Sequence, residues 1–154
     1  MLWSCTRSEH GEEVVLPKVG PDTVVLSWSV ISRSSDRDSL YVALDGSRNL
    51  NVTNRSPDGT MMSVTHTVSE KDYAKLIGTL RALDCCSIHS TSQERSSPSE
   101  AKPELKINFG DVRCKIDLWD REWREGRARK CGFAVARLHG GGFVPDPPFD
   151  EASP

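Results

Sequence analysis

The sequence lacks both a long apolar run and a strong net charge. No stretch of about 18 apolar residues occurs in the 154-residue chain, which excludes a transmembrane helix of ordinary length within it. The 20 basic and 22 acidic residues leave a formal net charge of −2, which gives no electrostatic reason to expect nucleic acid as a partner. Association with a membrane would therefore need a lipid anchor or a partner protein. With 36% hydrophobic and 27% charged residues, the composition suits one folded domain.

The sequence also lacks the motifs of common catalytic and metal sites. It contains no C-x-x-C pair, and Cys85, Cys86 and His89 make at most half of a tetrahedral zinc site. His139–Phe143, with three glycines, resembles the oxyanion strip of some lipases and esterases, but the G-x-S-x-G nucleophile motif is absent. We therefore predict a protein that is not an enzyme, with no catalytic residue, cofactor or metal.

The cysteines leave two interpretations open. The chain has five of them: Cys5, Cys85, Cys86, Cys114 and Cys131. Free thiols in a cytoplasmic protein are one interpretation. In the other, Leu2–Cys5 is the end of a bacterial lipobox whose basic and apolar parts lie upstream of Met1, and Cys5 carries a lipid. Lipidation would leave four cysteines, which is compatible with a disulfide among them, and would place the protein in the cell envelope.

Alternating apolar residues and turn residues predict an antiparallel sheet. In the predicted strand at 23–32, apolar side chains alternate with serines. By the same alternation, His66 falls on the inward face of the predicted strand at 62–68, where we expect a hydrogen-bonded core histidine. Turns are predicted at Asp45–Ser47 and Ser56–Gly59. The predicted strands are 23–32, 40–44, 50–52 and 62–68 as a meander, and 105–109 and 112–118 as a second hairpin.

Residues 69–84 are predicted to form an amphipathic helix that packs on the sheet. Ser69 is a natural N-cap, and acidic residues follow it in the first turn. The apolar residues recur at helical spacing: Tyr73, Leu76, Ile77, Leu80 and Leu83. From 120 to 137, glycines at 126 and 132 interrupt the pattern, so we predict only a poorly defined helix there. The expected fold class is α+β.

The polar segments divide the chain. Residues 1–13 have no apolar period and are predicted to be a flexible lead. A single domain is expected over 14–143, with a low-complexity mobile loop at 90–103. Residues 144–154, rich in proline and acidic residues, are predicted to be a disordered tail.

The segment from Trp119 to Lys130 interleaves tryptophans with basic residues, a combination enriched at protein-binding hot spots. Its candidate partner-binding residues are Trp119, Arg121, Trp123, Arg124 and Arg127. Three acidic residues reduce the local charge of the segment to +2, which argues against a surface that binds the phosphate backbone of a nucleic acid. An amphipathic segment with one tryptophan on the core explains the same pattern.

The order of elements resembles small bacterial envelope domains, mostly uncharacterised, that are described as lipoproteins. The residues that carry this resemblance are the meander through 40–46, the segment Val68–Asp84, the polar loop after it and the hairpin around Gly110. The layout, over about 23–118, is also similar to that of emfourin-type inhibitors of metalloproteases.

We therefore expect a non-enzymatic protein-binding module, tethered to a bacterial membrane if Cys5 is lipidated. It would engage another protein through a sheet edge or through the Trp119 to Lys130 segment. The alternative is an inhibitor or immunity-type protein that blocks an enzyme with the 90–103 loop or the tail.

Overall fold

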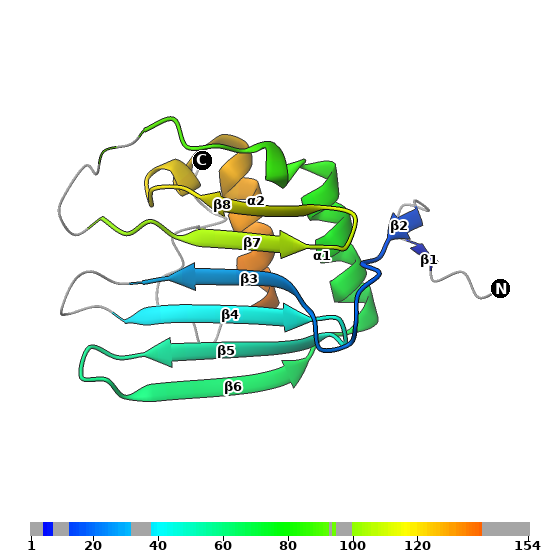
Figure 1. The fold of residues 1–154 in the computed structure, drawn as a ribbon, viewed down its shortest axis with the longest axis horizontal. Coiled ribbons are helices and arrows are strands. Elements are labelled where there is room, and N and C mark those ends of the chain that lie inside the picture. The colour runs from blue at the N-terminus through cyan, green and yellow to red at the C-terminus, as the bar shows by residue number, and fades with distance from the viewer. Residues whose placement is uncertain (1–4, 8–12, 32–37, 93, 95–99, 140–154) are drawn as a thin grey trace.

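The computed structural model describes residues 5–7, 13–31, 38–92, 94 and 100–139, which form an α+β fold (Figure 1). A six-stranded antiparallel sheet has the order β6-β5-β4-β3-β7-β8, and both α-helices lie on one of its faces. Its strands are β3 (Val24–Val30), β4 (Ser39–Asp45), β5 (Asn49–Arg55), β6 (Met61–Thr67), β7 (Glu104–Asn108) and β8 (Arg113–Asp117). A separate two-stranded ribbon pairs β1 (Cys5–Arg7) with β2 (Glu13–Val15).

The predicted meander and its turns are confirmed. Asp45 ends β4, and its Oδ1 accepts hydrogen bonds from the backbone N–H groups of Ser47 and Asn49, which closes the β4–β5 turn. Gly59 adopts a φ of 92°, a left-handed conformation that glycine takes without steric cost, in the β5–β6 turn. The chain therefore runs from β3 outward to β6 through neighbouring antiparallel strands, with short turns between β4 and β5 and between β5 and β6.

The β7–β8 hairpin joins the same sheet on the other side of β3. Leu26 pairs with Ile107 and Trp28 with Leu105, so that the inward positions of β3 and β7 lie side by side. This pairing puts the first strand of the meander in the interior of the sheet. It also makes β6 and β8 the two edge strands.

Helix α1 (Glu70–Ala82) has the cap and the buried face that the sequence predicts. The Ser69 side chain accepts a hydrogen bond from the Asp72 backbone N–H, and Glu70 and Asp72 lie in the first turn. The helix ends before Asp84, whose φ of 50° is left-handed. Its buried residues are Tyr73, Ala74, Leu76, Ile77 and Leu80, which pack on the inner face of the sheet.

The region from 120 to 137 is better ordered than its glycines suggest. A short 3-10 helix, η2 (Glu122–Arg124), leads into α2 (Gly126–Ala136), and η3 (Arg137–His139) follows. Gly126 is the first residue of α2 and Gly132 is buried, so neither residue breaks the helix. In Figure 1, α2 lies behind β8, β7 and β3.

Two other expectations differ from the structure. The ribbon of β1 and β2 places regular structure within the lead 1–13, which three-residue strands without an apolar period do not reveal in a sequence. His66 is on the inward side of β6 but is exposed, as are all seven residues of that strand. The prediction of a core histidine is therefore wrong, because β6 extends past the area that the helices cover. The tail 144–154 lies outside the described residues.

Candidate functional site

Trp123, the central candidate of the Trp119 to Lys130 segment, lies in the core. Its side chain is 0% exposed, and its ring meets that of Trp28 edge to face with centroids 4.9 Å apart. Its Nε1 donates a hydrogen bond to the Pro103 carbonyl oxygen at 3.0 Å. With its apolar surface packed and its polar atom bonded, Trp123 is not available to a partner in this structure.

Trp119 and Arg121 hold the start of the 90–103 loop against the domain. The Trp119 Nε1 donates to the Ser92 carbonyl oxygen, while Arg121 donates to the Ser92 hydroxyl and the Glu94 carbonyl and pairs with Glu100. Lys102 lies over the Trp119 ring, 4.8 Å from its centroid. These contacts fasten described residues at both ends of the loop to the segment that leads into η2.

Glu122 completes this attachment with four hydrogen bonds. Its carboxylate accepts them from the backbone N–H groups of Trp119 and Thr91 and from the hydroxyls of Ser90 and Thr91. Partial burial raises the pKa of Glu122, but these hydrogen bonds favour the charged form and outweigh burial, so the pKa lies below its usual value. The ionised carboxylate therefore stabilises the closed loop.

Arg127 and Arg124 also have partners within the chain. Arg127 donates to the carbonyl oxygens of Leu83, the C-cap residue of α1, and of Asp84, which follows it, and to the Ser87 hydroxyl. A cation at a helix C-terminus interacts favourably with the helix dipole. Arg124 pairs with Asp120 at 3.0 Å but remains exposed. Whether Arg124 contacts a partner stays a prediction.

Two disulfides account for four of the five cysteines. Cys85 pairs with Cys131 and joins η1 (Cys85–Ser87) to α2, while Cys86 pairs with Cys114 and joins η1 to β8. The Cα atoms of the pairs are 6.2 and 5.6 Å apart, within the normal span of a disulfide. Cys5 is outside both bonds.

The disulfides remove the half-site for zinc that Cys85, Cys86 and His89 suggested, because an oxidised cysteine has no thiolate to offer a metal. Within the described ranges, no three His, Cys, Asp or Glu side chains gather as a metal site. The glycine strip after His139, residues 140–143, lies outside those ranges.

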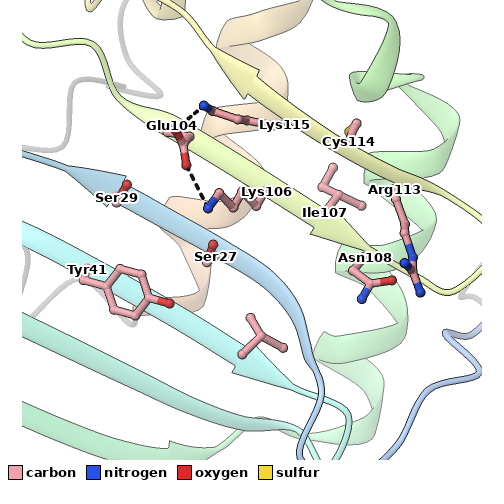
Figure 2. A pocket seen from close by; sticks show the side chains of 11 residues that line it. Ser27, Ser29, Tyr41, Glu104, Lys106, Ile107, Asn108, Arg113, Cys114 and Lys115 are labelled. Carbon is pink, nitrogen blue, oxygen red and sulfur yellow. Dashed lines mark ion pairs between the residues drawn. The ribbon is translucent and has the colours of Figure 1, made fainter.

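A shallow hollow of about 530 Å³ lies on the sheet face opposite the helices (Figure 2). Ser27, Ser29 and Tyr41 line it from β3 and β4. On β7 and β8, Glu104 forms ion pairs with both Lys106 and Lys115. The single carboxylate balances only one of the two ammonium groups, and Arg113 also lines the hollow, so its lining carries a formal net charge of +2.

Among the strands that the structure describes, none pairs with the outer edge of β6, and the backbone groups along this edge can be identified. The Ser56 N–H donates to the Thr60 carbonyl at one end of the β5–β6 ladder, and the Val68 N–H donates to the Arg48 carbonyl at the other. Because hydrogen-bonded pairs alternate along an antiparallel ladder, Val64 bonds to β5 whereas Ser63 and Thr65 point their N–H and C=O groups outward. A strand added here would bond to these groups.

The two edges of the sheet carry opposite kinds of side chain. β8 has charged residues at Arg113, Lys115 and Asp117, and η1 is fastened to it through Cys114. β6 has no charged residue and exposes apolar side chains: Met61 at 64%, Met62 at 56% and Val64 at 45%. Charged side chains and covering segments are the usual protection of sheet edges against pairing. β6 lacks the charged side chains.

A groove of about 1280 Å³ begins beside β6 and runs between α1 and α2. Its apolar walls include Leu76 and Leu83 of the α1 side and Phe133 and Leu138 of the α2 side. Five basic residues line it: Lys75, Arg124, Arg129, Lys130 and Arg137. Two acidic residues, Asp72 and Glu125, leave a net charge of +3. The groove thus joins the end of β6 to the basic half of the Trp119 to Lys130 segment.

No protein-family model and no curated protein matches this sequence. None of the helices in the described part of the chain has the length and hydropathy needed to cross a membrane. The features that distinguish this surface are the unprotected edge of β6 and the basic, apolar groove beside it.

Proposed function

We propose that this protein is a non-enzymatic binding module that recognises an extended segment of another protein along the outer edge of β6. The observation that carries the proposal is the contrast between the charged, fastened edge at β8 and the uncharged edge at β6 with its exposed methionines. A partner strand would gain main-chain hydrogen bonds from Ser63 and Thr65, as in other cases of strand addition.

The side chains of β6 add a means of specificity. Met62 and Val64 lie on the helix side of the strand, opposite Asn54 and Val52, and are exposed there. A bound strand would place alternate side chains against this apolar surface. Methionine is flexible and polarizable and adapts to partners of different shape. The surface therefore favours an extended partner segment with alternating apolar residues.

The disulfides support a location outside the cytoplasm, because such bonds persist in oxidising compartments and are rare in reducing ones. They also leave Cys5 as the cysteine free for another role. We therefore propose a module of a bacterial cell envelope that has Cys5 as its lipid anchor. The ribbon of β1 and β2 would then connect the anchor to the sheet.

Photo-crosslinking in the native host tests whether a partner protein binds along the outer edge of β6. A photoreactive amino acid at Met62 should yield a discrete adduct with another protein, and the same amino acid at Lys115 on β8 should not. Thr65→Pro, which removes an outward N–H, should abolish the adduct. Thr65→Ala, which loses the same side-chain hydrogen bond to Asn51 but keeps the N–H, should retain it. Equal adducts from both edges, or no difference between the two Thr65 variants, would refute the proposal.

The alternative function, an inhibitor that inserts the 90–103 loop into an enzyme, draws support from the attachment of that loop. Trp119, Arg121 and Glu122 hold its described ends in place, and a loop held in its bound conformation loses less entropy on binding. Deleting residues 95–99 should abolish inhibition of a secreted metalloprotease. Inhibition that survives the deletion would reject the loop as the inhibitory element.

A further inference from the structure

The groove between α1 and α2 matches the chemistry of one particular segment of this chain. Residues 140–154 follow η3 and contain three acidic residues, Asp146, Asp150 and Glu151, and no Lys, Arg or His. The groove has a net charge of +3 from its lining residues. The segment and the groove therefore carry equal and opposite formal charge, apart from any terminal carboxylate.

The apolar residues of the segment also have a counterpart. Phe143, Val144 and Phe149 stand among prolines, a composition that favours an extended backbone with few internal hydrogen bonds. The walls of the groove offer the partly buried Leu83, Phe133 and Leu138 to such side chains. Proline lowers the entropy that an extended segment loses when it is ordered. An extended acidic segment with two aromatic anchors thus fits a long, basic, apolar groove.

Residues 140–154 begin close enough to the groove between α1 and α2 to reach it. Arg137 and Leu138 line the groove and directly precede His139, the last described residue. Helix α2 has 11 residues and is therefore about 16 Å long. The 15 residues of 140–154 can extend roughly 50 Å, and Gly140–Gly142 permit a reversal of direction. The segment can thus turn back and run the full length of the groove.

We propose that residues 140–154 bind in the groove between α1 and α2 of the same chain, with Phe143 and Phe149 as anchors and the acidic side chains against Lys75, Lys130 and their basic neighbours. A tethered ligand acts at an effective concentration on the order of millimolar, so even a weak intrinsic affinity fills the groove. An outside ligand for the groove, such as an acidic aromatic peptide, must displace the segment. The proposal concerns this chain alone and does not depend on a partner at β6.

Site-specific crosslinking of the purified full-length chain tests the proposal. A photoreactive phenylalanine derivative at Phe149 should crosslink within its own chain to peptides of α1 and α2. Lys75→Glu with Lys130→Glu should weaken docking by about tenfold, because two attractive contacts become repulsive. Combining that pair with Asp146→Lys and Asp150→Lys should restore the crosslink. Lys106→Glu with Lys115→Glu, a matched reversal on the opposite sheet face, should leave it unchanged.

Three results would overturn the proposal. A crosslink that joins two chains would show that a second copy, not the same chain, fills the groove. Crosslinks spread over the surface without preference for α1 and α2 would show no docking site. A crosslink that is insensitive to the charge reversal would show that the basic rim has no part in binding. Circular dichroism of each variant checks that the domain remains folded.

Discussion

The rings of Trp28 and Trp123 meet edge to face at 4.9 Å, which ties β3 to η2 across the core. Trp123 is fully buried, and its indole also bonds to Pro103 at the end of the polar loop. Trp123→Ala should lower the free energy of unfolding by about 3–5 kcal/mol, the usual range for removing a large buried aromatic side chain. Chemical denaturation gives this value.

Tyr41→Ala is the matched control for the loss of an aromatic side chain. Tyr41 is 45% exposed on the open sheet face, so the variant should change stability by less than about 1.5 kcal/mol. Similar losses in the two variants would mean that Trp123 does not occupy the core position described here.

The two disulfides predict a defined thiol count and a large contribution to stability. The isolated, unreduced chain should show one reactive thiol, Cys5, when denatured, and none if a lipid occupies it. Cys85→Ser with Cys131→Ser opens a loop with a sequence separation of 46 and should cost about 2–5 kcal/mol. Thiol titration and denaturation measure the two quantities. More than one reactive thiol before reduction would contradict the pairing.

The hydrogen-bonded carboxylate of Glu122 predicts a loss of stability in acid. Its pKa is lowered in the folded state, so the unfolded state takes up a proton first as the pH falls. The stability that Glu122 contributes is complete above its ordinary pKa of 4.5 and is lost as the pH falls through the lower, folded value. The free energy of unfolding of Glu122→Gln should therefore differ most from that of the wild type near neutral pH, and the difference should shrink progressively below pH 4.5.

Denaturation at a series of pH values checks the Glu122 prediction. Glu125→Gln, which removes one negative charge from an exposed neighbouring residue, is the matched control for the change in net charge. A Glu122→Gln variant that stays parallel to the wild type would show that the attachment of the loop does not depend on the charge.

Local signals explain the part of the fold that the sequence predicts. The Ser69 cap, the apolar stripe from Tyr73 to Leu80 and the Asp45 turn each depend on residues within a few positions of one another. Such interactions depend on the local sequence alone, so the pattern and the structure agree.

Contacts between distant residues explain what the sequence leaves open. The alternation in β6 gives the side on which His66 lies, but its exposure depends on the position of β6 beyond the helices. The adjacent Cys85 and Cys86 allow several pairings, and only the packing of η1 between α2 and β8 selects one. For the same reason, the composition of the Trp119 to Lys130 segment does not separate a buried tryptophan from an exposed hot spot.

The direction of backbone groups along β6 makes a prediction about proline. The Val64 N–H lies on the β5 side of the strand, whereas the Thr65 N–H faces outward. Val64→Pro removes a ladder hydrogen bond and should lower the free energy of unfolding by about 1–3 kcal/mol, while Thr65→Pro should cost little beyond Thr65→Ala. Denaturation of the three variants gives the comparison. A Thr65→Pro variant as unstable as Val64→Pro would reverse the assigned alternation, and Ser63 and Thr65 would no longer be the groups that a partner strand meets.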